Sequence, residues 1–223
     1  MVTFPYTLVR SKRKSVSISV RSDATIVVRA PLRVSVSSID SFIESHTEWI
    51  RRSVERMRSR LSLSENRYDD GELFWYLGER YPLRISEAGN LSVSFSDNAF
   101  VLLRRFRSRA KERFCAWYKR EAKKILAERV VYFAERHGLS YHSIRINAAR
   151  TRWGSCSGKG HLNFTFRLVM APLFVIDSVV VHELAHLVHP NHSKYFWHTV
   201  AEMLPDFETG RQWLKRNGHL LEC

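Results

Sequence analysis

The stretch VVVHELAHLVHPNHSKYFW at residues 179–197 constrains this chain more than any other. Its apolar spacing predicts a helix over residues 175–189. On that helix His182 and His186 are four positions apart and project from one face. Two imidazoles on one face suit a single metal ion, while Glu183 is placed to act on a water at that ion but not to be a third helical ligand. The stretch therefore predicts a metal site built on a helix.

A break after this helix indicates where a third ligand comes from. Pro190 lacks a backbone N–H and disfavours helical geometry at His189, so the helix is expected to end there. Six residues beyond His186, His192 is placed for a returning segment to bring a third nitrogen to the metal, and water takes the fourth position. The alternative is a satisfied pair of core histidines. We leave His189 and His198 out of the ligand set, because a lone extra histidine more often lies at the surface or beside a site.

Motifs around the pentad HELAH resemble those of a known family. They are RWGSCS at residues 152–157, HLNF at residues 161–164 and NHSKYFW at residues 191–197. This segment is similar to the YgjP-like metal-dependent hydrolases, relatives of the SprT and Spartan-type zinc metalloproteases. Metzincins share the ligand spacing, but they have glycine at the position of His189 and a Met-turn, for which Met203 follows too soon. We therefore disfavour a metzincin.

The resemblance implies a cofactor, a ligand set and a fold. It implies one zinc ion per chain with three ligands: His182, His186 and His192. It also implies that Glu183 is catalytic. The expected fold class is α+β, with a zincin-like metallopeptidase core in residues 104–223, where the active-site helix packs on a small mixed sheet. Residues 1–103 are expected to form a β-rich N-terminal region with one long helix.

Charge and cysteine content bear on partners and compartment. The chain has 223 residues, 44% of them hydrophobic, and a net charge of +14. A charge of this size favours an anionic partner such as nucleic acid, although a solvated basic surface is the alternative. Three widely spaced cysteines, Cys115, Cys156 and Cys223, argue against a disulfide framework and for a reducing compartment. Without a signal-peptide core or a bilayer-length apolar run, we expect a cytoplasmic protein with no membrane partner.

The N-terminal half shows strand and helix patterns without a catalytic cluster. Alternation over residues 15–31 predicts two strands, and helical spacing over residues 38–61 predicts one long helix. The later turns of this helix carry a first basic run, from Arg51 to Arg60. A polar loop is expected at residues 62–71. A small antiparallel sheet is then predicted, with four strands: residues 74–77, 81–85, 91–95 and 100–103.

Three more helices are predicted in the second half. The longest covers residues 104–137 and ends before Gly138. It opens on a second basic run, from Arg104 to Arg113, which helix electrostatics do not explain because cations oppose the dipole at an N-terminus. We therefore expect this run and the first to bind nucleic acid, unless both are simply solvated. Ser193 is expected to cap a second helix, and residues 207–217 are expected to form the third.

Two strands are predicted in front of the metal-binding helix. They cover residues 143–148 and 160–170 and bracket a turn at residues 154–160. The resemblance places this hairpin beside the metal helix, where an extended substrate can add to a sheet edge. Trp153 is expected to pack in the core, although it could wall the cleft. Cys156 is given no role.

The predicted site fits hydrolysis by a zinc-activated water. Zinc lowers the pKa of a bound water to about 7 and polarises a carbonyl, so that Glu183 takes the proton and passes it to the leaving amine. We expect a SprT-like metallopeptidase that acts on protein or peptide substrates, DNA-associated proteins among them. One alternative is a zinc hydrolase of nucleoside triphosphates or another small phosphate substrate. Another is a nucleic-acid-binding module with a structural metal, which would need a fourth protein ligand. The oligomeric state is not predicted.

Overall fold

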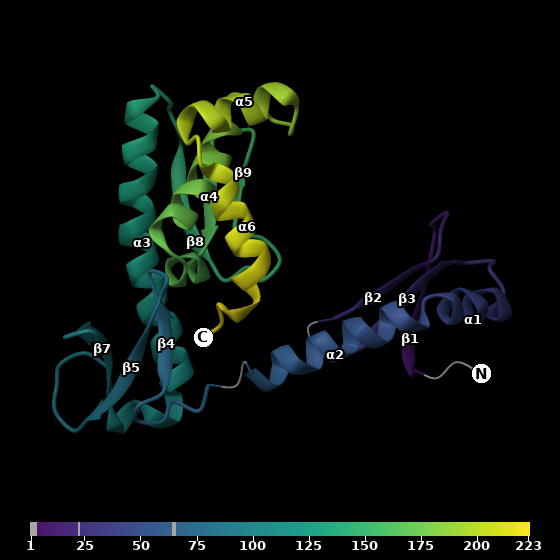
Figure 1. Cartoon of the computed structure of the whole chain (residues 1–223), viewed down its shortest axis with the longest axis horizontal. Helices are drawn as coiled ribbons and strands as arrows, with labels where there is room; N and C mark the ends of the chain where they lie inside the picture. Colours follow the sequence, from purple (N-terminus) through teal and green to yellow (C-terminus); the bar gives the residue numbers. More distant parts are fainter. Residues whose placement is uncertain (1–3, 22, 64–65) are drawn as a thin grey trace. The chain divides into compact units, whose positions relative to one another are not determined.

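The chain folds into two compact units, residues 1–65 and residues 66–223 (Figure 1). The structure, a computed structural model, describes these residues: 4–21, 23–63 and 66–223. The expected division after residue 103 is not where the chain divides. The strands before that residue and the long helix after it belong to one hydrophobic core, so separating them would expose apolar surface that each covers on the other.

The first unit is a three-stranded sheet with two helices. Its strands are β1 (Tyr6–Ser11), β2 (Ser17–Val20) and β3 (Ile26–Pro31), and its helices are α1 (Val36–Ser45) and α2 (Thr47–Leu63). The strand order is β1-β3-β2, with β1 parallel and β2 antiparallel to β3. The two strands predicted from the alternation are confirmed. Helix α2 extends to Leu63, into the segment expected to be a loop.

The single long helix expected in the first unit is interrupted at His46. In a continuous helix the carbonyl oxygen of Phe42 would accept the backbone N–H of His46. Instead this oxygen lies 2.8 Å from Oγ of Ser45 and 2.8 Å from Nδ1 of His46. Side chains that bond the backbone in this way compete with the helical hydrogen bond. The chain therefore turns and starts a new helix at Thr47.

The second unit begins with a mixed sheet of four strands. They are β4 (Leu73–Tyr76), β5 (Glu79–Ser86), β6 (Val93–Ser96) and β7 (Ala99–Leu103), in the order β4-β5-β7-β6. The expectation of an antiparallel sheet is wrong for β5 and β7, which are parallel. A tight turn at Asp97 and Asn98, with φ of 50° and 55°, joins β6 to β7. This hairpin places its second strand beside β5, and the two strands then run the same way.

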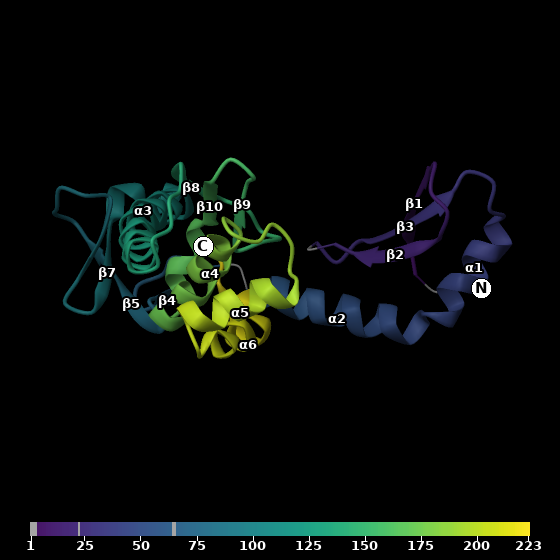
Figure 2. The same cartoon turned by 90° about the horizontal axis from the view of Figure 1, so that it is seen from above.

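The rest of the second unit is a three-stranded sheet with helices. Its strands are β8 (Ser143–Asn147), β9 (Gly154–Cys156) and β10 (His161–Thr165). The α-helices are α3 (Ala110–Arg136), α4 (Leu173–Ala185), α5 (Lys194–Met203) and α6 (Phe207–Asn217), and the 3-10 helices are η1 (Arg104–Arg109), η2 (Phe166–Met170) and η3 (Gly218–Leu220). The strand order is β8-β10-β9, with β10 parallel to β8 and antiparallel to β9. Figure 2 shows these strands next to α4.

Several boundaries differ from the predicted ones. Residues 154–156 pair with β10 instead of belonging to the turn. Residues 166–170 form a 3-10 helix instead of continuing a strand, and all five are buried. A short apolar run has the same hydrophobicity in either conformation, so periodicity alone does not decide between them. The long helix proper begins at Ala110 and ends at Arg136, before Gly138 as predicted. The last helix has the predicted bounds.

Aromatic residues join the first sheet of this unit to α3. The ring centroids of Phe74 and Phe114 are 4.5 Å apart, and those of Phe100 and Trp117 are 4.9 Å apart. Buried aromatic side chains contribute large apolar areas, and their tilted and edge contacts add to the packing energy. This cluster continues into the core around α4. Among the described residues no helix is long and apolar enough to cross a membrane.

An ion pair ties α3 to α4, the helix that carries the predicted site. Nε of Arg129 donates to Oδ1 of Asp177 at 2.6 Å, and its Nη2 donates to Oδ2 at 2.9 Å. Both side chains are largely buried, and the bidentate geometry fixes the two helices in register. The hydrogen bond to Asp177 raises the pKa of Arg129, so the guanidinium group stays charged.

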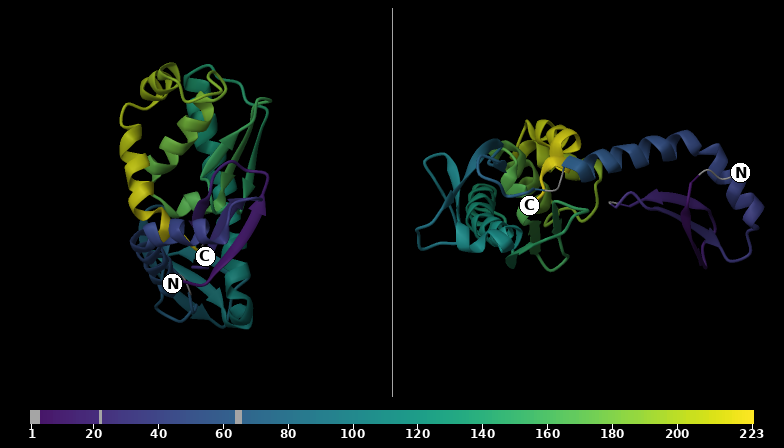
Figure 3. Two further views of the ribbon diagram at one scale, coloured as in Figure 1. Left: turned by 90° about the vertical axis from the view of Figure 1, so that its right-hand side faces the viewer. Right: turned by 90° about the horizontal axis from the view of Figure 1, so that it is seen from below.

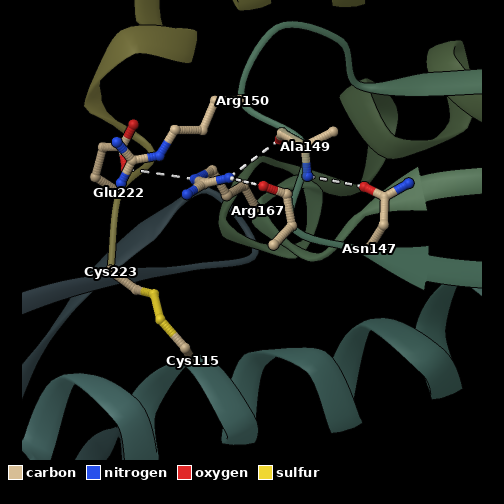
Figure 4. Close-up of polar contacts among 8 residues, drawn as sticks. Cys115, Asn147, Ala149, Arg150, Arg167, Glu222 and Cys223 are labelled. Atoms are coloured by element: carbon tan, nitrogen blue, oxygen red, sulfur yellow. Dashed lines mark hydrogen bonds and ion pairs between the residues drawn. A yellow bond between two sulfur atoms is a disulfide. The ribbon is translucent and has the colours of Figure 1, made fainter. Parts of the chain in front are cut away.

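Cys115 of α3 forms a disulfide with Cys223 (Figure 4). The inference against disulfides is therefore wrong, because a separation of 108 residues in sequence says nothing about proximity in the fold. The expectation of a reducing compartment loses its support, since disulfides persist mainly in oxidising environments. Cys156 is a free cysteine and is half-buried.

Glu222, which precedes Cys223 in the chain, forms an ion pair with the buried Arg167. Figure 4 shows Arg167 between Glu222 and the loop before β9. Nη1 of Arg167 donates to the carbonyl oxygens of Ala148 and Ala149, at 3.1 Å each, and its Nε lies 3.4 Å from Oε2 of Glu222. Burial lowers the pKa of Arg167. Arg167 therefore links Glu222, near the C-terminus, to the loop that leads into β9.

We expect Cys115→Ser to lower the free energy of unfolding of the second unit by roughly 2–5 kcal/mol, because the disulfide restricts the unfolded chain over a long loop. Urea titrations under non-reducing conditions, followed by tryptophan fluorescence, measure this change. Cys156→Ser is the matched control, since it removes a thiol without removing a cross-link. Equal midpoints for wild type and Cys115→Ser would show that the disulfide adds nothing to stability.

Candidate metal centre

Three histidines of the second unit lie close together. His182 is in the last turn of α4, His186 is the C-cap residue of that helix, and His192 is in the loop before α5. One ring nitrogen of each lies within 4.8 Å of the others, and the two Nε2 atoms of His182 and His192 are 3.0 Å apart. Tetrahedral zinc with Zn–N bonds of about 2.0–2.1 Å holds its ligands about 3.3 Å apart. The donors and their separations therefore fit a metal ion.

Helix α4 ends at Ala185, four residues before the predicted end. The backbone N–H of Leu187 donates to the carbonyl of Leu184 at 3.0 Å, a bond that tightens the last turn. His186 nevertheless keeps helical backbone angles, with φ of −66° and ψ of −16°. Its ring therefore still projects from the same face as that of His182, as the spacing predicted.

Two contacts orient the imidazole rings. Nδ1 of His186 is 3.1 Å from the carbonyl oxygen of His189, which leaves Nε2 of His186 free to bind a metal. His189 thus contributes its backbone instead of its ring, which periodicity does not reveal. Phe196 of α5 contacts the rings of His182, His186 and His192, with centroids 4.9, 4.6 and 4.8 Å away. This one aromatic side chain supports the whole cluster.

Burial sets the charge state of the site. It lowers the pKa of His182 to about 4, with the neighbouring histidines adding to the effect, and it also lowers the pKa of His186. Both rings are therefore neutral at pH 7, and each has a lone pair for a metal. Burial raises the pKa of Glu183 to about 7, against the opposing charge of Arg152. A bound cation lowers that pKa again, toward the ionised form that a general base needs.

Strand β9 holds the carboxylate of Glu183 in place. The backbone N–H of Cys156 donates to this carboxylate. A Cβ added at Gly154 would lie 2.5 Å from Oε1 of Glu183, so only glycine leaves room for the acid at this point. The motif RWGSCS therefore serves the site through its backbone, a role for Gly154 and Cys156 that the sequence pattern does not reveal.

A cavity of about 400 Å³ adjoins the histidine cluster. Its walls are Trp153, Gly154, Ser178, Val179, His182, Glu183, Arg211, Leu214 and Lys215. The last three belong to α6, which lies beside α4 in Figures 1 and 3 (yellow beside green). Trp153, expected to pack in the core, also forms part of this wall. Ligand pockets commonly have volumes of about 300–1,000 Å³, so the cavity is large enough to admit part of a substrate.

The second basic run, from Arg104 to Arg113, is partly neutralised. Three of its arginines form ion pairs: Arg104 with Glu87, Arg107 with Asp69 and Arg109 with Glu112. The guanidinium carbons of Arg105 and Arg113 lie 5.2 and 4.9 Å from the ring centroid of Phe106. Phe106 is the aromatic residue of this run that could stack on a base, and two guanidinium groups already lie over its ring. These contacts reduce the charge and the stacking surface that the run offers to a nucleic acid.

The first basic run, from Arg51 to Arg60, is described in part. Arg51 and Arg52 both pair with Glu48, at 3.0 and 2.8 Å. The side chains of its other three arginines lie outside the described residues: Arg56, Arg58 and Arg60. Exposed pairs of this kind are worth about 0–1 kcal/mol each. Nucleic-acid binding through the two runs therefore stays a prediction from the sequence.

The chain matches the profile of the YgjP-like family, described as "YgjP-like, metallopeptidase domain", over residues 14–217. No curated protein matches the chain. Among solved structures, the chain is similar to one titled "Crystal structure of the metallopeptidase zymogen of Pyrococcus abyssi abylysin". That chain is 21% identical, and the alignment covers 40% of this chain and 93% of that one, with a TM-score of 0.35, too low to establish a shared fold. Since the family profile spans most of the sequence and includes the three histidines and Glu183, the chain belongs to the YgjP-like metallopeptidase family.

Proposed function

We propose that this protein is a zinc-dependent metallopeptidase with a zincin-like core, which hydrolyses peptide bonds by attack of an activated water. The observation that carries the proposal is the cluster of His182, His186 and His192 beside the buried carboxylate of Glu183. A zinc ion bound there supplies a Lewis acid that polarises the scissile carbonyl and acidifies water. The related alternative of a calcium or magnesium site is disfavoured, because imidazole ligands suit zinc and oxygen ligands suit those ions.

The number of ligands favours a catalytic ion over a structural one. Within the part of the chain that the structure describes, the cluster offers three ligand residues. Structural zinc sites are closed by four protein ligands, whereas catalytic sites keep one position open. A nucleic-acid-binding module with a structural metal would need a fourth residue in this cluster. The ligand set therefore supports hydrolysis.

Glu183 has the position and environment of a general base. It follows the ligand His182 directly on α4, is 5% exposed, and is held by the backbone N–H of Cys156. In the proposed reaction a carboxylate oxygen of Glu183 accepts a proton from the attacking water. The same oxygen then delivers this proton to the leaving amine, so that the residue ends the reaction as it began.

The sheet next to Glu183 favours a peptide as substrate. Strand β9 is at the edge of its sheet, and it contacts the catalytic carboxylate through Gly154 and Cys156. An extended peptide that adds to this edge is held by main-chain hydrogen bonds, which require little sequence specificity. Such a peptide passes beside Glu183. A nucleoside triphosphate has no comparable backbone to pair with the strand.

We expect the zinc-loaded protein to cut unstructured polypeptides, with new N-termini detected by mass spectrometry, and to release no phosphate from nucleoside triphosphates. A panel of casein, a denatured globular protein and the common nucleoside triphosphates tests this directly, each with and without DNA. Release of phosphate or pyrophosphate without any peptide fragment would support the phosphate-hydrolase alternative instead. Cleavage that depends on DNA would support the prediction of a DNA-associated substrate.

A further inference from the structure

The cavity beside the metal centre has a wall whose chemistry the proposed reaction does not use. His182 and Glu183 form one side, so any group that enters lies next to the bond to be cut. The volume of about 400 Å³ corresponds to roughly a dozen water molecules at ~30 Å³ each. It therefore has room for a side chain of the substrate together with some water.

The opposite wall is one face of α6. Arg211, Leu214 and Lys215 are spaced i, i+3 and i+4, so they lie on the same side of the helix. The helix is held close to α4 at Gly210, where an added Cβ would lie 2.2 Å from Oγ of Ser178. A larger residue would push α6 away and widen the cavity. The two cations are therefore placed over the site by the packing of the helix.

Arg211 is fixed but has donors to spare. Its Nη1 donates to Oε2 of Glu208 at 2.7 Å, and its guanidinium carbon lies 4.5 Å from the ring centroid of Trp197. A guanidinium has five N–H donors, and this contact with Glu208 uses one. A fixed guanidinium costs less conformational entropy when it binds a ligand than a mobile one. Arg211 is thus prepared to bind a second carboxylate.

Lys215 adds an uncompensated charge. Within the described residues no acidic group forms an ion pair with its ammonium group. Glu183 is the one carboxylate among the residues that line the cavity, and the positive charge of Arg152 acts on it. Lys215 and Arg211, whose charge is partly offset by Glu208, therefore face the site from α6, and a divalent ion on the histidines would add to the positive potential. An acidic group is attracted into such a cavity and a basic group is repelled.

We propose that this cavity is a specificity pocket in which Arg211 and Lys215 bind an acidic side chain of the substrate. The inference rests on the proposed peptidase function. The apolar walls, Leu214 and Val179, suit the methylene groups of a glutamate. The cations lie in the middle and at the end of α6, away from the backbone N–H groups of its first turn that would cradle a phosphate. A single carboxylate therefore fits this wall better than a phosphate chain.

The test uses three peptides that differ at one position next to the cut bond, with Glu, Gln or Lys there. We expect wild type to cut the Glu peptide about tenfold faster in kcat/KM than the Gln peptide, which has the same shape, and the Lys peptide most slowly. Lys215→Glu is expected to reverse this order. Arg216→Glu is the matched control, because it makes the same change of charge on the next residue of α6, which does not line the cavity.

Zinc content and circular dichroism of each variant confirm that it is folded and loaded, and Lys215→Gln serves as a milder variant that should flatten the preference. If wild type, Lys215→Glu and Lys215→Gln each cut all three peptides at equal rates, the cavity does not distinguish the charge of the substrate. The inference is then wrong, while the peptidase proposal stands. If loaded wild type cuts no peptide, both proposals fall together. A reversed preference in Arg216→Glu as well as in Lys215→Glu would attribute the effect to net charge and would also overturn the pocket.

Discussion

Glu183→Gln is expected to keep the metal and the fold while its kcat/KM falls by roughly a hundredfold to ten-thousandfold, the usual contribution of a general base. The amide has the shape of the carboxylate and can still accept the N–H of Cys156, but it cannot take a proton from water. Initial rates on one cleavable peptide, with zinc content measured on the same samples, give this ratio.

The matched control for this change is Glu202→Gln. Glu202 is an exposed carboxylate of the same unit, on α5, whose side chain is 62% exposed and lies near His198. Its loss is expected to leave turnover unchanged. Wild-type rates in Glu183→Gln would contradict the mechanism, and loss of zinc from that variant would mean that the carboxylate holds the ion and does not act on water.

His192→Ala is expected to remove zinc from the protein. Loss of a direct ligand should weaken binding by more than about a hundredfold, which is the upper end for residues that only support a ligand. His192 is the exposed member of the set, in a loop, so its removal disturbs the core less than removal of His182 or His186. Competition with a chromogenic chelator measures the affinity, and metal mass spectrometry gives the occupancy.

His198→Ala provides the comparison, because it removes a histidine of α5 whose side chain is 73% exposed and which is not in the ligand set. Its zinc content should equal that of wild type. Full occupancy in His192→Ala would exclude this residue as a ligand and leave the site with two histidines. A loss of zinc in both variants would indicate a general effect on the fold of α5.

The grouping of the three histidines follows from local rules, so their spacing in the sequence was enough to expect it. The four-residue spacing of His182 and His186 fixes their common face, and Pro190 requires a break that brings the chain back at His192. The supporting residues do not follow in this way. Gly154 acts only because β9 lies against Glu183 of α4, a tertiary contact that the local sequence pattern does not contain.

In the fold as well, features set by local sequence could be predicted and features set by long-range contacts could not. Alternation and helical spacing predicted β2, β3 and α6, because the period of the apolar residues in each segment shows which face is buried. The parallel pairing of β5 with β7 and the disulfide from Cys115 to Cys223 depend on the path of the chain through space. The break at His46 depends on which donor reaches one carbonyl oxygen, which a hydrophobic pattern does not contain.

The most direct test of the central claim is metal-dependent cleavage of a peptide. The protein is stripped with a chelator, dialysed, and supplied with one equivalent of zinc, and fragments of an unstructured peptide are followed by mass spectrometry. We expect no fragments from the stripped protein, fragments after zinc is restored, and none from Glu183→Gln treated in the same way. A peptide that stays intact with wild type carrying one zinc per chain, or that is cut equally by stripped and restored protein, would contradict the central claim.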